Sequence, residues 1–485
     1  MSQEVSRGHS TRKRKGRINK PLQSTNQCVY LIRKMKSIRR ILRKVIENDD
    51  DRQTKRRKSK TMKLMDKVLS KDNLNQAYLQ VIRNKGASGI DEMTCEEVKD
   101  YLKVHGEELI NQILSRRYNP LPVRRVEIPK PNGGTRKLGI PTVIDRIIQQ
   151  ALVQVLSPIF EQTFSEYSYG FRPNRRCQNA IDRTLELINQ GYEWIIDLDL
   201  EKFFDNVPHD KLIRIIDNAC NDSDITSLIM KYLKAGVMEN GEFIKSEIGT
   251  PQGGNLSPLL SNVYLNLLDK ELENRHLNFA RYADDVVIFV KTEYSAERVM
   301  RNIVSFIETK LQLKVNASKT HICKPNNLKY LGFTFYRDFK NSITWKAKPH
   351  NDSVLKFKRK LKKLTKRSWS VDLTFRIKKL NEIIRGWINY YRFSPMHKTL
   401  FRIGKWLRVR IRMIIWKQWK NPKTRELALL KLGYSKRDAY SQSNTRKSYY
   451  RVARSWILAK AITNERLKKR GLLDPVEYYH KSVVS

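Results

Sequence analysis

Apolar and polar positions alternate along residues 194–199, where the sequence reads Trp-Ile-Ile-Asp-Leu-Asp. This two-residue period is typical of a β-strand, and the carboxylate of Asp199 stands at its end. Residues 279–290 contain two runs of apolar, aromatic and β-branched residues on either side of Asp284 and Asp285. Such runs predict two buried strands joined by a tight turn, which would hold both acids at a fixed place.

Other segments show the spacing of helices. The turn-rich residues 249–258 lead into apolar positions three to four apart over residues 259–268, and the same spacing recurs over residues 380–388. Residues 29–46 combine this spacing with intervening Arg and Lys, which predicts a short basic amphipathic helix. The chain therefore mixes strands and helices, and we expect an α+β fold.

The acidic positions suggest metal-dependent chemistry. Mg²⁺ prefers six oxygen ligands and keeps several waters, so two or three carboxylates from separate strands and substrate phosphates suffice to hold it. Asp199 and Asp284 would supply these carboxylates for two ions about 4 Å apart. Asp197 and Asp205 are interpreted as neighbours that point elsewhere. An aromatic-x-Asp-Asp string also arises by chance, so this pattern alone leaves a purely structural role open.

Seven sequence blocks together resemble the reverse transcriptases of group II introns. Three of them, residues 194–205, 249–258 and 279–290, are similar to motifs A, B and C of the reverse transcriptase palm. Residues 128–141 resemble the fingers hairpin, and residues 167–173 resemble a further block found in these enzymes. Residues 313–333 resemble motif D with the primer grip, and residues 385–391 resemble the maturase thumb called domain X. The similarity runs from Met62 to Ser485 and is greatest to the compact bacterial enzymes that lack an endonuclease domain.

The resemblance implies a right-hand polymerase, an α+β fold in which helical fingers and a palm with an antiparallel sheet precede a helical thumb. We expect a basic and partly disordered leader at residues 1–61 and the fingers and palm at 62–339. The thumb, or domain X, would occupy 340–412, and a basic helical nucleic-acid-binding region, expected to bind DNA, would occupy 413–485.

The resemblance also implies roles for single residues. The catalytic residues would be Asp199, Asp284, Asp285 and Lys319. The metal ligands would be Asp199, Asp284 and the backbone carbonyl of Leu200. The incoming nucleotide would contact Lys130, Arg136, Phe204 and Gln252. Phe204 would act as a steric gate under the sugar. Template and primer would contact Arg172, Gly253, Gly254, Tyr330, Leu331 and Gly332. Intron RNA would contact Arg385, Trp387, Arg408, Arg410, Arg412, Lys417 and Lys420.

The implied activity is RNA-templated DNA synthesis from deoxynucleoside triphosphates, with two Mg²⁺ ions for which Mn²⁺ can substitute. The implied partners are group II intron RNA, whose splicing the protein would assist, an RNA template with a DNA primer, and target DNA for retromobility. Without an endonuclease, the primer would come from a nascent strand at a replication fork or from another nick. The protein would act as a monomer or a homodimer.

The charge distribution supports binding to nucleic acid without reference to any family. Lys and Arg number 21 against 5 Asp and Glu in residues 1–63, 36 against 36 in residues 64–339, and 39 against 8 in residues 340–485. The net charges of +16, 0 and +31 sum to the total of +47. A balanced middle between two basic ends is typical of an enzyme that binds a polyanion, with an affinity that falls as salt rises.

Two other functions remain open from the sequence. One is an RNA-binding splicing cofactor whose polymerase site has decayed, and the other is a reverse transcriptase recruited for host defence or linked to a CRISPR locus. The tryptophans of the last third, such as Trp416 and Trp419, would pack in a helical core or stack on RNA. The leader would either grip intron RNA or be dispensable, with the working enzyme beginning near Met62 or Met65.

The composition argues against several classes of protein. No stretch approaches the ~20 apolar residues of a membrane span, and the basic start lacks the apolar core of a secretory signal. We therefore expect a cytoplasmic, nucleic-acid-associated bacterial protein with no membrane partner. The five cysteines are scattered in sequence, which indicates neither a disulfide framework nor a zinc site. The His and Cys cluster of an appended endonuclease is not expected.

Overall fold

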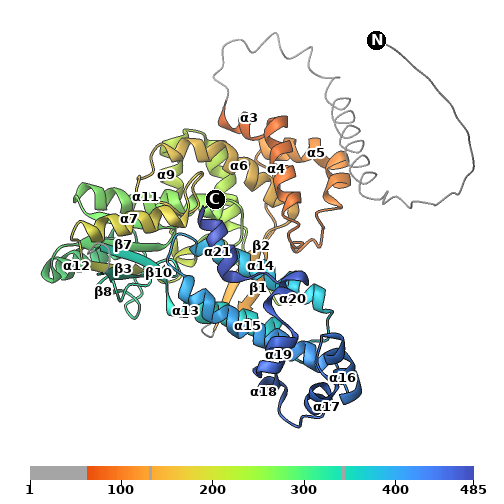
Figure 1. Ribbon diagram of the computed structural model, residues 1–485. Coiled ribbons are helices and arrows are strands. Elements are labelled where there is room, and N and C mark those ends of the chain that lie inside the picture. Colours follow the sequence, from red (N-terminus) through yellow and green to blue (C-terminus); the bar gives the residue numbers. More distant parts are fainter. Residues whose placement is uncertain (1–62, 130–133, 340–343, 485) are drawn as a thin grey trace, which may run out of the picture. The chain divides into compact units, whose positions relative to one another are not determined.

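The computed structural model describes residues 63–129, 134–339 and 344–484 (Figure 1). The chain divides after residue 63, and residues 64–485 form the unit described below. The predictions for the leader, including the amphipathic helix at residues 29–46, lie outside the described residues, and so does Lys130. The unit of residues 64–485 has a mixed α+β architecture, as the sequence pattern predicts.

The central sheet of this unit contains the acidic strands. Its four strands lie in the order β6-β7-β3-β8, and all neighbours are antiparallel. Their bounds are β3, Trp194–Asp199; β6, Asn278–Tyr282; β7, Asp285–Val290; and β8, His321–Cys323. Alternate residues of β7 enter two different apolar cores, Val286 and Ile288 on one side of the sheet and Val287 and Phe289 on the other. This double burial explains why the strand is an unbroken apolar run.

A second sheet contains the predicted fingers hairpin. Its order is β2-β1-β4-β5, with β1 and β2 antiparallel and β1 and β4 parallel. The bounds are β1, Val123–Pro129; β2, Thr135–Ile140; β4, Val237–Glu239; and β5, Glu242–Ile244. The hairpin itself is confirmed, while residues 130–133, between its strands, lie outside the described part.

Helices pack against the central sheet (Figure 1). The helices that precede the last third are α3, Leu64–Val68; α4, Lys71–Arg83; α5, Val98–Leu114; α6, Val143–Glu161; α7, Cys177–Asn189; α8, Phe203–Asn206; α9, His209–Cys220; α10, Ser223–Lys234; α11, Ser257–Asn274; and α12, Glu293–Thr309. Helix α6 is long and apolar enough to cross a membrane by length and composition, but 67% of the qualifying window is buried inside the protein. It forms the centre of the first core, where it packs against α4, α9 and α11.

The last third begins with a two-stranded antiparallel sheet and continues as helices. The strands are β9, Phe333–Asp338, and β10, Thr344–Pro349. The helices are α13, Asn351–Leu364; α14, Leu373–Tyr391; α15, His397–Gln418; α16, Pro422–Lys431; α17, Lys436–Ser443; α18, Tyr449–Ala453; α19, Trp456–Ala461; α20, Asn464–Lys469; and α21, Pro475–Val484. The second core is continuous from the palm sheet through these helices.

Candidate active site

The three predicted catalytic carboxylates meet at one end of the central sheet. Asp199 is the last residue of β3 and lies directly opposite Asp285, the first residue of β7. Tyr282 pairs with Asp285, so Ala283 and Asp284 alone form the turn between β6 and β7. The sequence prediction of a strand-turn-strand element that presents two acids is therefore confirmed.

These carboxylates are crowded and desolvated. Burial raises the pKa of Asp285 to about 7, and the neighbouring charge of Asp284 adds to the shift. Burial also raises the pKa of Asp284, to which the charge of Asp199 contributes, and it raises the pKa of Asp197 to about 6. Since crowded carboxylates disfavour one another's charged forms, a bound divalent cation would relieve the repulsion.

The donor set fits magnesium that shares its coordination with substrate. Within the described residues, no group of three or more His, Cys, Asp or Glu could hold a metal ion by itself. Two carboxylates and a carbonyl leave most octahedral positions to water and phosphate, which is the usual arrangement for Mg²⁺. Leu200 forms an isolated antiparallel bridge to Val315, and the bonds of that bridge use the flanking groups, Asn316 N–H to Asp199 C=O and Glu201 N–H to Lys314 C=O. The Leu200 carbonyl therefore points away from Val315 and toward the β7 side.

Lys319 lies beside Asp199. Its ammonium group is 2.9 Å from Oδ2 of Asp199, and the lysine side chain is 64% exposed. The backbone of the same segment is also attached to Asp199, because the Asp199 N–H donates to Oγ1 of Thr320 and the Asp199 carbonyl accepts from Asn316. An exposed ammonium group on a firmly held turn can move from the carboxylate to a nearby phosphate.

Of the residues predicted to contact the nucleotide, Phe204 is bonded through its backbone to the glycine-rich loop, residues 249–258. The carbonyl of Phe204 accepts a 2.6 Å hydrogen bond from the N–H of Thr250, and Gly249 donates to Val207. Gly249 has φ of 89°, and a Cβ there would stand 2.8 Å from the carbonyl oxygens of Phe204 and Asp205. The glycine-rich loop is therefore fitted directly against the backbone of the predicted steric gate.

The other side of this loop is bonded to the fingers. The carbonyl of Gln252 accepts from Gly139 N–H at 2.7 Å. A Cβ on Gly253 would stand 2.4 Å from the carbonyl oxygen of Gly139, and one on Gly254 would meet the side chain of Gln149. Both glycines were predicted to contact template. In the structure, the close packing of this loop on the fingers leaves no room for a side chain at either position, which by itself accounts for glycine there. Arg136, on the same hairpin, is close enough for its charge to act on Asp284.

The predicted primer grip is held by the thumb. Leu331 and Gly332 both have positive φ, 49° and 82°. The hydroxyl of Tyr390 donates to the carbonyl of Leu331, and that of Tyr391 donates to the carbonyl of Gly332. Tyr330 is only 2% exposed, so it supports the turn from beneath, while Leu331 and Gly332 are half-buried.

Arg172 differs from its predicted role. It is 7% exposed, and its guanidinium forms an ion pair with Glu161 and donates to the carbonyls of Ser165 and Ser168. A guanidinium with its N–H groups committed inside the fold has little left for a template phosphate. We therefore assign Arg172 to the internal support of the segment around residues 165–172.

The basic residues of the last third fall into two groups. Arg408 pairs with Asp474, Arg410 donates to Thr365, and Arg412 is 8% exposed and donates to the carbonyl of Ile462. These three bonds hold segments of the last third together, which differs from the predicted contact of these side chains with RNA. By contrast, Arg385 and Lys420 are exposed, and Lys417 is exposed while its ammonium group donates to the carbonyl of Arg367.

The tryptophans of the thumb pack internally. Trp387 stacks on Phe357, with ring centroids 4.5 Å apart, and Trp416 is 2% exposed. Trp419 lies edge-on against Trp416 and is half-buried. Core packing, the alternative to RNA stacking for these residues, is thus what the structure shows for Trp416 and Trp387.

Comparison with known proteins bears on the same residues. Residues 128–335 match a reverse transcriptase (RNA-dependent DNA polymerase) family model, and residues 354–433 match that of the group II intron maturase-specific domain. Protein YkfC of Escherichia coli K12 is 35% identical over 302 residues, which cover 54% of this chain and 78% of that protein. The chain belongs to the group II intron-encoded reverse transcriptases. Its match to the reverse transcriptase model includes Asp199, Asp284 and Asp285, the three carboxylates predicted to be catalytic.

Two further similarities are partial. Group II intron-encoded protein LtrA of Lactococcus lactis is 40% identical over 217 residues, which cover 44% of this chain and 36% of that protein. The chain thus aligns with about a third of LtrA, although with most of YkfC. A solved partial Cas6-RT-Cas1–Cas2 complex is 22% identical with a TM-score of 0.34, covering 52% of this chain and 43% of that one.

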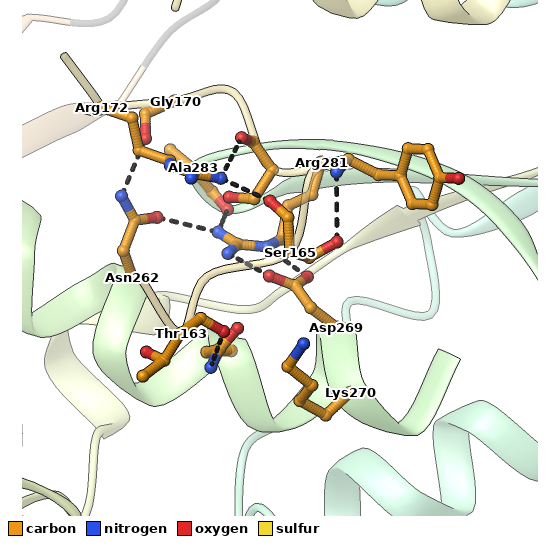
Figure 2. Close-up of polar contacts among 12 residues, drawn as sticks. Thr163, Ser165, Gly170, Arg172, Asn262, Asp269, Lys270, Arg281 and Ala283 are labelled. Atoms are coloured by element: carbon orange, nitrogen blue, oxygen red, sulfur yellow. Dashed lines mark hydrogen bonds and ion pairs between the residues drawn. The ribbon is translucent and has the colours of Figure 1, made fainter. Parts of the chain in front are cut away.

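Sequence reasoning missed the residues beneath the catalytic turn of this reverse transcriptase. Arg281 lies in the buried strand β6, and its guanidinium bonds to Asp269, Asn262 and the carbonyl of Ala283 (Figure 2). His209, also missed, places its Nε2 2.6 Å from the carbonyl of Gly249. A charged residue within an apolar strand was the available signal for Arg281, since such a residue needs a partner.

Proposed function

We propose that this protein copies RNA into DNA at the sheet end that carries Asp199, Asp284 and Asp285. The observation that carries the proposal is the direct pairing of Asp199 with Asp285 beside a turn formed by Ala283 and Asp284. Asp199, Asp284 and the Leu200 carbonyl would hold Mg²⁺, which when bound supplies charge stabilisation for the attacking and leaving oxygens. Two ions, replaceable by Mn²⁺, are part of the proposal.

The chain's own residues would orient the other reactants. Arg136 and Lys130 would bind the triphosphate, Phe204 would lie under its sugar, and the turn of Leu331 and Gly332 would hold the primer strand. The primer 3′-hydroxyl loses its proton to solvent water as its oxygen forms a bond to the α-phosphorus and the bond from that phosphorus to the bridging β-phosphate oxygen breaks. Lys319 would give a proton to the departing pyrophosphate.

We further propose that the last third binds intron RNA and assists its splicing. Residues 340–485 carry 39 basic against 8 acidic side chains. A pocket of about 600 Å³ lies in this region and is lined by Lys366, Arg367, Ser368, Arg410, Met413, Lys417, Ser448, Tyr449 and Tyr450. Its lining has no anionic side chain. Beside Arg410, which is bonded to Thr365, it includes Lys366, Arg367 and Lys417, which suits the RNA backbone. Within the proposal, fingers and palm occupy residues 62–339, the thumb 340–412, and the DNA-binding region 413–485.

Primer extension tests the polymerase. Purified protein with Mg²⁺, deoxynucleotides, an RNA template and a DNA primer should extend the primer, and extension should cease when the metal is chelated. A parallel assay measures splicing of a group II intron RNA with and without the protein. Splicing assistance without any extension would favour a pure splicing cofactor and reject the polymerase.

Substitution of Lys319 by alanine should slow each turnover. Loss of a positioned proton donor typically costs 10²–10⁴-fold, so we expect the single-turnover rate to fall by about 100-fold with little change in nucleotide affinity. Rapid-quench measurement of single-nucleotide addition separates the two quantities. Lys314→Ala, which changes an exposed lysine of the same segment, is the control. An equal loss of rate in both variants would show that Lys319 has no specific role in the reaction.

Substitution of Gly249 by alanine should weaken selection for deoxynucleotides. The added Cβ meets the carbonyls of Phe204 and Asp205 and must displace the proposed steric gate. We expect the preference for deoxy- over ribonucleotides to fall about tenfold, which corresponds to about 1.4 kcal/mol. Gly191→Ala is the matched control, because Gly191 has a similar φ of 91° with open space around an added Cβ. Unchanged selectivity in Gly249→Ala would contradict the role given to this contact.

A further inference from the structure

The catalytic turn has an unusual backbone for its residue type. Ala283, between Tyr282 and Asp284, has φ of 57°, in the left-handed region that alanine rarely adopts. Its side chain is buried, with the residue 4% exposed. Such a conformation persists only where surrounding contacts enforce it. Since Asp284 follows directly, the direction in which its carboxylate points depends on whatever holds Ala283.

Arg281 supplies a direct contact to this residue. Its Nη1 atom donates a 3.0 Å hydrogen bond to the carbonyl of Ala283 and a second, also 3.0 Å, to Oδ1 of Asn262. Its Nε atom donates at 2.6 Å to Asp269, whose other carboxylate oxygen pairs with Nη2. Both charged side chains are 0% exposed. Figure 2 shows the guanidinium between Asp269 on one side and the Ala283 carbonyl on the other.

The same group connects the turn to two other segments. Asp269 and Asn262 both come from α11, the helix that follows the glycine-rich loop. Asn262 also donates to the carbonyl of Gly170 at 2.8 Å, and a Cβ on Gly170 would stand 2.3 Å from the backbone nitrogen of Ala283. The turn is thus enclosed by Gly170 on one side and supported by Arg281 on another.

We propose that Arg281 is a positioning residue for catalysis, which orients Asp284 by holding Ala283 in its left-handed conformation. The inference rests on the proposed polymerase function. A buried ion pair is often replaceable by apolar residues without loss of stability, so stability alone gives little reason for this pair. Only the planar fork of arginine can bind both oxygens of Asp269 and still reach a backbone carbonyl, which a lysine ammonium cannot do.

Two variants separate this role from a merely structural one. Arg281→Lys keeps a positive charge beside Asp269 but shortens the reach to Ala283. The double variant Arg281→Met with Asp269→Leu removes both charges together, so that no unpaired charge stays buried. Tyr118→Phe is the control, because it removes another buried hydrogen bond, 2.6 Å from the Tyr118 hydroxyl to Asp145 in the fingers, far in sequence from the catalytic turn.

The first readout is independent of activity. Mn²⁺ binding is measured by electron paramagnetic resonance on protein with a dideoxy-terminated primer, an RNA template and a nucleotide, and amide hydrogen exchange is followed in peptides containing residues 281–286. Removal of a group that orients a metal ligand typically costs 10- to 100-fold in metal affinity or activity. We expect about tenfold weaker Mn²⁺ binding and faster exchange in both Arg281 variants, with neither change in Tyr118→Phe.

The second readout is kinetic. Both Arg281 variants should lose 10- to 100-fold in kcat, with the KM for nucleotide within about threefold of wild type and the thermal midpoint of the double variant preserved. A folded double variant with wild-type Mn²⁺ affinity, exchange and kcat would overturn the inference, and so would an equal loss in Tyr118→Phe. If the wild type itself extends no primer, the proposed function fails, while Mn²⁺ binding and hydrogen exchange still decide the role of Arg281.

Discussion

Replacement of Asp284 by asparagine should reduce RNA-templated DNA synthesis by more than about 1,000-fold, or about 4 kcal/mol of transition-state stabilisation. Asparagine has the shape of aspartate without its charge, so the turn should be retained while a proposed metal ligand is weakened. Binding of intron RNA should stay within about threefold of wild type, because the carboxylate serves the chemistry and not the affinity for RNA. Replacement of Asp284 and Asp285 together by alanine should have the same two effects.

The same substitution should leave the metal-free fold at least as stable. Burial raises the pKa of Asp284 above its usual range, so the folded state disfavours the charged form. An acid whose folded-state pKa is raised weakens the fold as pH rises from its unfolded value through its folded value. Asparagine carries no charge at any pH, so the thermal midpoint of Asp284→Asn without Mg²⁺ at pH 8 should equal or exceed that of wild type.

Three measurements on one preparation check this expectation: primer extension, filter binding of a group II intron RNA, and thermal unfolding without Mg²⁺. Asp205→Asn is the control, because Asp205 is exposed on α8 and was expected to point away from the metals. Synthesis by Asp284→Asn at more than a tenth of the wild-type rate would show that the catalytic assignment is wrong.

Affinity for intron RNA should fall by about 10³–10⁵-fold between 50 and 200 mM monovalent salt. This range corresponds to six to ten phosphate contacts, each of which releases condensed counterions. The net charge of +31 over residues 340–485 makes such a number of contacts available. Equilibrium binding at five or more salt concentrations gives the slope of log affinity against log salt.

Substitution of basic residues should change the magnitude of this slope in proportion to the contacts removed. The double variant Arg385→Gln with Lys420→Gln changes two exposed residues of the last third and should lower the magnitude of the slope by about 1.4–1.8, since each phosphate contact contributes about 0.7–0.9. Lys103→Gln, on an exposed lysine of the fingers that pairs with Asp100, should leave the slope unchanged. A slope near zero for the wild type would reject electrostatic RNA binding by this region.

The sequence by itself determined the elements of the catalytic centre. Apolar alternation ends at Asp199 in β3, and two β-prone runs flank Asp284 and Asp285, so local periodicity was enough to predict strand, turn and strand. The fingers hairpin followed from the family resemblance, and helical spacing over residues 380–388 indicated part of the helical last third. The function followed from the order of these blocks, a linear property of the chain.

Only the tertiary structure decided which polar side chains serve the fold. Arg172 and Arg412 look like nucleic-acid ligands in sequence, yet both are buried and bonded internally. No role was predicted for Arg281, although it donates a hydrogen bond to the backbone of the catalytic turn. The physical reason is that a sequence shows a charge but not its partner. Packing alone brings such partners together, as with Asp269, 12 residues from Arg281, and Ile462, 50 residues from Arg412.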